Sequence, residues 1–219
     1  MSPPQKGSRA ESGLRDHLAV GYQSPETLDA GLDHIRRSPA DHGELRLIVA
    51  RPSNAERELL PTATLSRDLG LVGDNWLARG SRHTADGAAD PNRQITVMNV
   101  RAAELVAGGI DRAPLAGDQL YVDLDLSVAN LPGGTILTIG EAAIEISDAP
   151  HLGCAKFVDR FGPDAMRFVN SRTGRALRLR GLNARVVVPG TIRVGDAVTR
   201  HRASSQPRST TMRRVGPAA

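Results

Sequence analysis

The sequence predicts a single, mainly β domain with short helices, and its pattern favours a barrel or sandwich over a sheet of alternating βαβ units. Three observations support this. Seven or eight short segments alternate apolar and polar residues, glycine and proline interrupt them, and the helical segments between them are short. A length of 219 residues suits one domain with its own core.

The first element expected is a short helix over residues 24–39. Ser24 can cap its start, Pro25 suits the first turn, and Ser38-Pro39 ends it. We expect this helix to belong to a loose leader, 1–42, that precedes the main domain.

Strands are predicted where apolar residues recur at every second position. They cover 43–52, 93–99, 117–128, 135–148 and 182–200; the fourth segment is a hairpin turning at Gly140-Glu141, and the last is two strands around Pro189-Gly190. A helix that ends at Gly108-Gly109 follows 93–99, and another covers 162–171, where Gly162 precedes Pro163. Residues 43–200 therefore form the domain.

The charge is concentrated at the C-terminal end. Residues 200–219 hold five arginines and no acids, so residues 1–199 carry 23 basic and 24 acidic side chains and are nearly neutral. We expect 201–219 to be a disordered, arginine-rich tail. Because the chain has only three Phe, two Tyr and one Trp, it lacks the aromatic platforms on which bases stack. Nucleic-acid binding is not expected.

Targeting signals and disulfides are not expected. The N-terminal stretch MSPPQKGSRAESG has no apolar run, no stretch of eighteen apolar residues occurs, and one cysteine cannot form an internal disulfide. The sequence therefore predicts a cytoplasmic protein without a membrane partner.

The only cysteine, Cys154, lies in the stretch APHLGCAKFVDRFG. A lone cysteine is most often a small buried hydrophobe. Here proline and glycine surround it, which indicates a loop after a strand pair, and His151 and Lys156 lie close enough in sequence to lower its pKa. A thiolate at the rim of a barrel is a nucleophile or a ligand for a soft metal. Both alternatives, and the buried thiol, stay open at this point.

Seven arginines follow within 160–185, with one acid, Asp164, among them. Guanidinium groups bind phosphate and carboxylate with two parallel hydrogen bonds. A solvated helix face would give the same composition. A candidate thiolate and an anion-binding field within thirty residues together suggest a phosphorylated cofactor whose reactive atom meets sulfur.

Two further stretches carry candidate residues. In LGLVGDNW, 69–76, Gly73 permits close backbone approach to an anion, and Asp74 follows it; an ordinary tight turn explains the stretch equally well. The polar loop 81–94 contains His83 and Arg93. His83, His151 and Cys154 lack the spacing of a zinc-finger site, so zinc is not expected.

Several segments resemble the MOSC family, named after the C-terminal domain of molybdenum cofactor sulfurases. The matching stretches are GLVGDNW at 70–76, RQITVMN at 93–99, LAGDQLYVD at 115–123, ILTIGEAAIEIS at 136–147, PHLGCAKF at 150–157 and RGLNARVVVPGTIRVGDAV at 180–198. Their order is that of the family. The stretch FGPDAMRFVNS is similar to the compact, stand-alone bacterial type.

The resemblance implies a β-barrel that binds molybdenum cofactor, a pterin dithiolene carrying a phosphate and a molybdenum centre. It implies that Cys154 holds the metal or carries sulfur. A soft thiolate suits the metal and arginines suit the phosphate. The remaining candidates are Lys156, Arg160, Asn170, Arg178, Arg180, Gly73 and Arg93 for binding the cofactor, and His151 and Asp74 for moving protons.

Two functions remain open. The first is a molybdenum-dependent oxidoreductase that acts on N-hydroxylated compounds and receives electrons from a separate donor, since no cysteine-rich ferredoxin segment is present. The second is a sulfur carrier or cofactor-delivery module that forms a persulfide on Cys154 with a cysteine desulfurase as partner. Pyridoxal phosphate is not expected, because Lys156 alone is little evidence for a Schiff base.

Overall fold

The computed structural model describes residues 21–201. The greater part of the leader, 1–20, and the tail from residue 202 onward lie outside the described residues. The disorder predicted for the tail therefore stays a prediction. The described elements follow one another as α1 (Pro25–Ala30), α2 (Leu32–Arg36), β1 (His42–Ala50), β2 (Glu58–Leu60), β3 (Thr62–Ser66), β4 (Gly70–Leu71), α3 (Trp76–Arg79), β5 (Ile95–Asn99), α4 (Val100–Ala107), β6 (Leu120–Asp123), β7 (Ile136–Ile139), β8 (Ala142–Ile146), α5 (Ala155–Asn170), α6 (Arg172–Ala176), β9 (Leu182–Val188), β10 (Gly190–Arg193) and β11 (Ala197–His201). Two 3₁₀-helices, η1 (Pro91–Arg93) and η2 (Ile110–Ala116), complete them.

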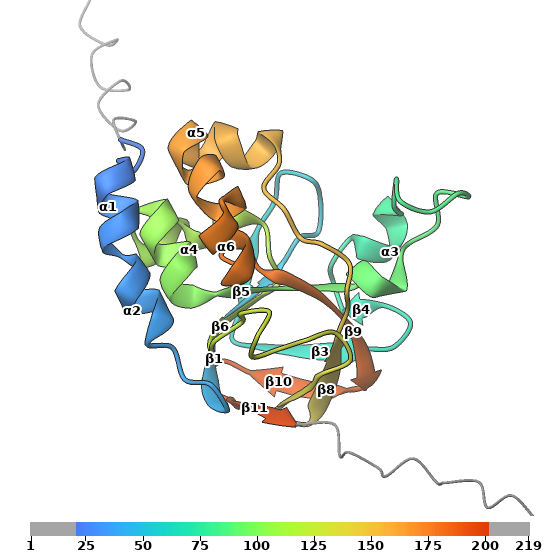
Figure 1. The fold of residues 1–219 in the computed structure, drawn as a ribbon. Helices are drawn as coiled ribbons and strands as arrows, with labels where there is room; N and C mark the ends of the chain where they lie inside the picture. Colours follow the sequence, from blue (N-terminus) through green and yellow to red (C-terminus); the bar gives the residue numbers. More distant parts are fainter. Residues whose placement is uncertain (1–20, 202–219) are drawn as a thin grey trace, which may run out of the picture.

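Seven strands close into a barrel. Their order is β11-β7-β8-β9-β5-β6-β1, and β1 pairs back onto β11 through Glu44 and Ala197, which closes the ring. All neighbours are antiparallel except β5 and β6, which run parallel with helix α4 between them in sequence. The predicted single-domain β-barrel is confirmed (Figure 1).

The number of strands predicted from the sequence was too low, since the described residues form eleven strands rather than seven or eight. The extra ones are short. Strand β2 pairs with β1 outside the ring, and β3 and β4 join β10 in a three-stranded sheet. Strands of two to five residues give too few alternating positions to be recognised by periodicity.

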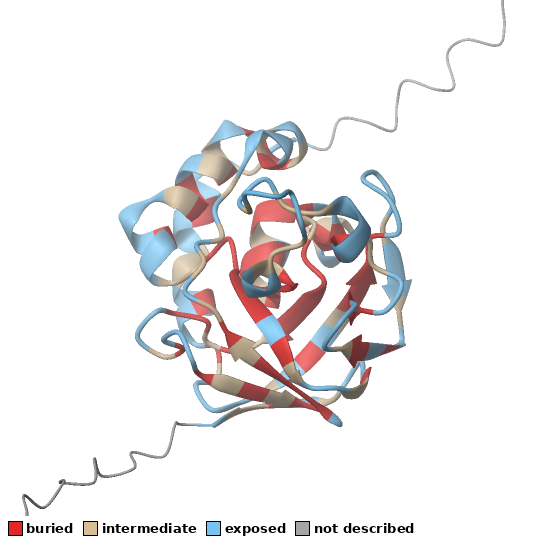
Figure 2. Cartoon of the chain, turned by 90° about the vertical axis from the view of Figure 1, so that its right-hand side faces the viewer, coloured by how far each residue is buried: buried red, intermediate tan, exposed pale blue. Residues whose placement is uncertain are grey.

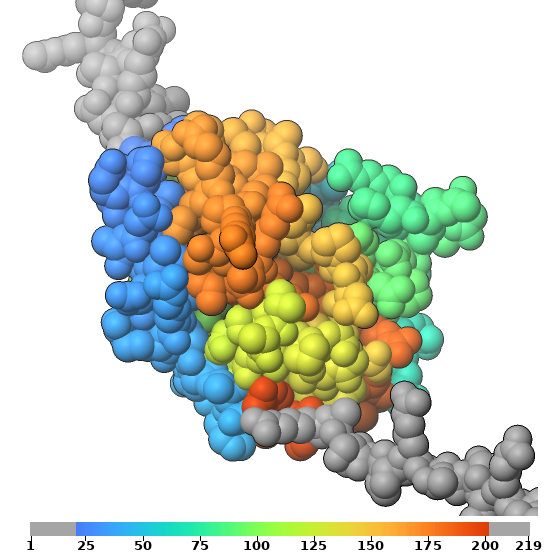
Figure 3. All heavy atoms as spheres, in the orientation of Figure 1, coloured from blue at the N-terminus to red at the C-terminus, as the bar shows by residue number. Residues whose placement is uncertain are grey.

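The core has two layers because β5 and β6 bury both of their faces. Val97 and Leu120 point into the barrel interior, whereas Met98 and Tyr121 point outward, under the helices. The helices α1, α2, α4, α5 and α6 gather on that outer side (Figure 1), and the strands beneath them appear as buried ribbons in Figure 2. The segment between β6 and β7 covers another part of the barrel, as the yellow-green atoms of Figure 3 show.

The helix predicted over 24–39 is confirmed at its start and divided at its middle. The Ser24 hydroxyl accepts a hydrogen bond from the Thr27 amide, and Pro25 occupies the first turn. Gly31 separates α1 from α2. No helix among residues 21–201 combines the length and apolar character needed to span a bilayer.

Two predicted boundaries were wrong. The strand expected over 117–128 is reduced to β6, Leu120–Asp123, because the chain leaves the sheet after Asp123. The helix expected over 162–171 is only the second half of α5, which begins at Ala155 and is kinked at Gly162, where φ is 84°. The missed first half carries Lys156 and Arg160.

Candidate functional site

A cavity of about 670 Å³ lies where the loop after β1, helix α3 with the loop after it, and the start of α5 converge on the barrel. Its volume is in the range of pockets that take a small ligand or cofactor. Six of the residues predicted from the sequence line it: Arg93, His151, Cys154, Lys156, Arg160 and Arg180. Segments that are far apart in sequence thus meet around one space.

The lining is strongly cationic. Eight basic side chains face the cavity against a single acid, Asp90; they are Arg51, Arg57, Arg79, Arg82, Arg93, Lys156, Arg160 and Arg180. Five of these, Arg57, Arg79, Arg82, Lys156 and Arg160, form no ion pair with any residue of 21–201. Half of the eight were not anticipated: Arg51, Arg57, Arg79 and Arg82.

Three consecutive carbonyls hold three of these arginines in place. The oxygens of Leu115, Ala116 and Gly117 accept hydrogen bonds from Arg160, Arg180 and Arg51, at 2.5, 3.0 and 2.9 Å respectively. They lie at the end of the 3₁₀-helix η2, where carbonyls have no partner within the helix. Gly117 ends that helix with φ of 90°, a conformation that favours glycine. The turn therefore fixes the direction of three guanidinium groups at once.

Two of the arginines form ion pairs with buried carboxylates. Asp118 accepts from Arg180 Nη1 at 2.6 Å, and Asp74 accepts from both Arg51 Nε and Nη2, at 2.7 and 2.8 Å. Both acid side chains are fully buried. Asp118 was not among the candidates, because nothing in the stretch LAGDQLYVD distinguishes it from an ordinary surface aspartate.

The proton-moving role expected for Asp74 does not agree with this geometry. Each of its carboxylate oxygens already accepts two hydrogen bonds, from Arg51 and from the amides of Arg51 and Trp76. The side chain also lies outside the cavity lining. Asp74 is a positioning residue for Arg51, and the neighbouring Gly73, at φ of 90°, forms an exposed tight turn away from the cavity.

His151 is held neutral by its surroundings. Its Nδ1 lies 3.5 Å from Asp118 Oδ1, and neither atom has another hydrogen-bond partner. Burial, followed by the charge of Arg180, lowers the pKa of His151 to about 4, although Asp118 opposes the change. At neutral pH the ring therefore contributes no positive charge to the thiol three residues away.

This pKa predicts a loss of stability in mild acid. The unfolded chain binds a proton at His151 near pH 6.5, whereas the folded protein does not do so until about pH 4. Because the unfolded state holds more protons between these values, the free energy of unfolding falls as the pH drops through this window, by about 3 kcal/mol. Urea unfolding at pH 7 and 4.5 should show a smaller difference in His151→Gln than in the wild type. Equal pH dependence in both proteins would contradict this, and the exposed His42→Gln is the control.

Cys154 lies at the N-cap position of α5 and is exposed. The buried-thiol alternative is therefore excluded. The thiol shares the cavity wall with the exposed Lys156, and Phe157 beneath them packs against Arg180, whose guanidinium carbon is 5.2 Å from the ring centroid. Asn170 does not face the cavity; its Oδ1 accepts from the Gly153 amide at 3.1 Å and fixes the backbone before the thiol.

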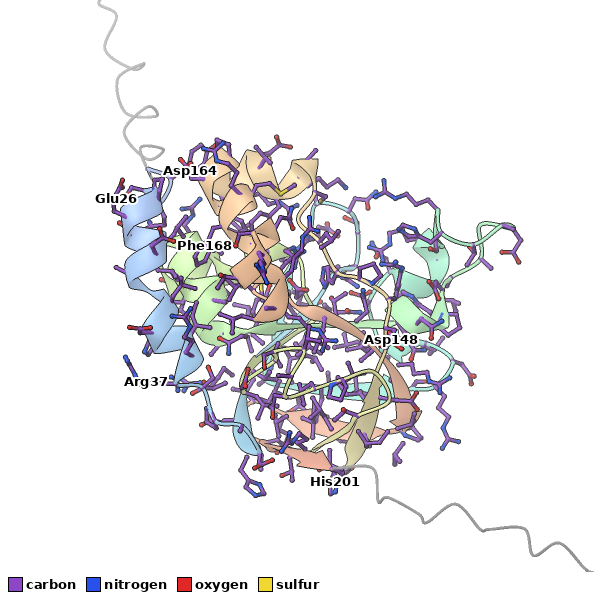
Figure 4. The ribbon with its side chains drawn as sticks, viewed as in Figure 1. Glu26, Arg37, Asp148, Asp164, Phe168 and His201 are labelled. Carbon is purple, nitrogen blue, oxygen red and sulfur yellow. The ribbon has the colours of Figure 1, made fainter. Side chains whose placement is uncertain are left out.

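The remaining arginines of 160–185 are distributed elsewhere. Arg167 pairs with Asp164 and Arg185 with Glu145, both on the surface. Arg178, at φ of 49°, lines a second, adjoining cavity of about 300 Å³ together with Asp148, which Figure 4 labels. Of the seven arginines in 160–185, only Arg160 and Arg180 line the main cavity. The alternative prediction, that these arginines form a solvent-exposed face, is therefore correct for part of the segment.

The described residues contain no group of three or more His, Cys, Asp or Glu side chains placed to hold a metal ion. The family model of the MOSC domain matches residues 80–199. No curated protein matches the chain.

Two solved structures are similar in fold. The YuaD protein from Bacillus subtilis has a TM-score of 0.55 at 18% identity, over 74% of this chain and 97% of that one. YiiM from Geobacillus stearothermophilus has a TM-score of 0.51 at 16% identity, over 73% and 75%. At such identities the likeness extends to the fold alone.

Proposed function

Because the chain belongs to the MOSC domain family, we propose that it binds a molybdenum cofactor and acts as the molybdenum component of a reductase for N-hydroxylated compounds. The family model covers more than half of the chain, including Cys154.

 Five of the eight basic side chains that line the cavity lie within the residues that the family model matches, namely Arg82, Arg93, Lys156, Arg160 and Arg180, and Arg51, Arg57 and Arg79 precede them.

One observation carries the proposal: the exposed thiol of Cys154 and the cationic lining share one cavity. The donor set fits a pterin phosphate beside a thiophilic metal, since a thiolate suits the metal and guanidinium groups suit the phosphate. Buried polar atoms support this fit. The Nε atoms of Arg57 and Arg180 have no hydrogen-bond partner within the described residues, and both side chains line the cavity.

When bound, the cofactor supplies the two-electron chemistry at molybdenum. In this proposal Cys154 Sγ would bind the molybdenum. Arg57, Arg160 and Lys156 neutralise the phosphate, and Asn170 keeps the backbone before the thiol in place. The neutral imidazole of His151 accepts and passes on a proton at the cavity wall.

Exchange of Cys154 for serine tests the proposal. Wild type and Cys154→Ser, purified from a host that makes molybdenum cofactor, are analysed for molybdenum and released pterin per chain. We expect near-stoichiometric molybdenum in the wild type and a loss of at least about tenfold in the variant, since a serine hydroxyl is a far poorer ligand for this metal. Pterin content should fall much less, because the arginines remain.

The matched control is Ala155→Ser, which adds a hydroxyl to the same cavity wall and keeps the thiol. It should retain the metal. Equal molybdenum in Cys154→Ser and the wild type would rule out the thiol as ligand. Full metal loading without reduction of N-hydroxylated compounds by reduced mediators would rule out the reductase and leave cofactor binding.

A sulfur-carrier function is the second candidate, and the exposure of Cys154 favours it because a partner enzyme can reach the thiol. Its thiolate would take the outer sulfur of a desulfurase persulfide and release the desulfurase thiolate. Absence of molybdenum and pterin from both proteins, with a persulfide trapped at Cys154, would establish this function instead. Absence of the persulfide as well would exclude both.

A further inference from the structure

We propose that the cavity holds two phosphate-class groups at once, so that its complete ligand carries a diphosphate or two separate phosphates. This inference rests on the proposed function in one respect, because the cofactor phosphate is taken as the first of the two groups. The second group has its own set of arginines.

The first subsite lies between Arg57 and Arg160. A Cβ added to Gly117 would lie 3.3 Å from Arg57 Nη2 and 3.5 Å from Arg160 Nη1, so the two guanidinium groups flank this glycine. Arg57 Nε is buried without a partner, and Arg160 has one hydrogen bond, to Leu115. Two cations with free N–H groups on either side of a residue without a side chain form a clamp for one anion.

The second subsite is formed by Arg79 and Arg82, at the end of α3 and in the loop that follows. Neither guanidinium has an ion pair or hydrogen bond within residues 21–201. The connecting Gly80 has φ of 66°, and a Cβ there would lie 2.2 Å from the Gly87 oxygen. The base of the loop is therefore closely packed, and it holds both arginines at the cavity.

Arg51 lies near both subsites, since its guanidinium donates to the Gly117 oxygen and its own carbonyl accepts from the Asn75 amide at the start of α3. Its charge contributes to lowering the pKa of Arg57 and also that of Arg79, although burial is the larger cause in both cases. Arg51 is itself fixed by Asp74 and the Gly117 oxygen. A ligand with two linked phosphates would therefore have one cation pair at each end and a fixed cation in the same cavity.

The charge balance favours two groups over one. Five cations of the lining have no ion pair with the described residues, whereas a phosphate monoester carries a charge of about −1.5 to −2 at pH 7. A single phosphate would leave about three like charges in a partly buried space. A second phosphate of the same charge would reduce this excess to about one to two.

Calorimetric titration of the full chain with orthophosphate and pyrophosphate tests the proposal at physiological ionic strength. We expect one pyrophosphate per chain, bound at least about tenfold more tightly than orthophosphate. In Arg79→Ala/Arg82→Ala the affinity for pyrophosphate should fall to that for orthophosphate, and binding of orthophosphate should persist. In Arg57→Ala/Arg160→Ala the affinity for pyrophosphate should fall in the same way, because only the second subsite remains. Arg46→Ala, an exposed arginine outside the cavity, is the control.

The outcomes separate this inference from the proposed function. Pyrophosphate bound no more tightly than orthophosphate would overturn the inference, while the metal and pterin measurements on Cys154→Ser decide the proposed function independently. An equal loss of both anions in Arg79→Ala/Arg82→Ala would also overturn it.

Phosphorus analysis of the cofactor-loaded protein distinguishes the sources of the second phosphate. Two phosphorus atoms per molybdenum would indicate a cofactor that itself carries the diphosphate. One phosphorus per molybdenum, with the pyrophosphate preference intact in the cofactor-free chain, would indicate that a phosphorylated substrate brings the second group.

Discussion

Replacement of Asp74 with alanine should lower the free energy of unfolding by about 3–5 kcal/mol. The variant leaves the buried guanidinium of Arg51, whose side chain is 8% exposed, without its carboxylate. The variant also removes the hydrogen-bond acceptor of two backbone amides. These are the amide of Arg51, just after β1, and the amide of Trp76, the first residue of α3. Denaturant unfolding of the ligand-free chain measures the effect.

The control for this prediction is Asp33→Ala. Asp33 pairs with Arg36 on the surface, where ion pairs contribute about 1 kcal/mol or less. The double variant Arg51→Met/Asp74→Leu should recover a large part of the loss, since it removes both charges together. If Asp74→Ala is no less stable than Asp33→Ala, the buried pair does not support the cavity.

Replacement of Gly181 with alanine should cost about 3–5 kcal/mol in the free energy of unfolding. Gly181 has φ of 102°, a conformation in which side chains are strained, and an added Cβ would lie 2.4 Å from the Val97 oxygen of β5. The residue follows Arg180 directly, and its amide donates to the Arg178 oxygen. Any relief of the contact therefore moves the turn that directs Arg180 into the cavity, and cofactor content should fall as well.

Gly195→Ala separates the effect of backbone strain from the effect of the contact with the Val97 oxygen. Gly195 has a similar φ of 94°, but no atom lies within 4 Å of an added Cβ. This variant should show backbone strain alone, about 1–3 kcal/mol. Equal unfolding free energies for the two variants would mean that the contact with Val97 adds nothing.

The barrel was predictable because its longer strands alternate cleanly. Strands β7 and β8 meet at Gly140, whose φ of 54° suits the tight turn expected there. Strand β6 was overextended because Leu124 and Leu126 continue the alternation after the chain has left the sheet, and both remain buried. An alternating pattern indicates which side chains are buried, but it does not indicate which residues pair with a neighbouring strand.

The site was predictable only where its residues lie close together in sequence. Cys154, Lys156 and Arg160 share the first half of α5, and a local motif identified them. Arg57 and Arg79 come from a loop and a four-residue helix before the residues that the family model matches, and they share a cavity with Arg160 only through the closure of the barrel. Asp118 gives no sequence signal because its importance depends on burial beside Arg180.

Closure of the barrel also constrains the order of events during synthesis. The pair Glu44–Ala197 joins residues separated by roughly 150 positions, and β1 leaves the ribosome long before β11. Until β11 arrives, the hydrogen-bonding edges of β1 and β7 stay open to other strands. With so many long-range pairings, the chain should fold slowly and depend on protection of these two edges in the growing polypeptide.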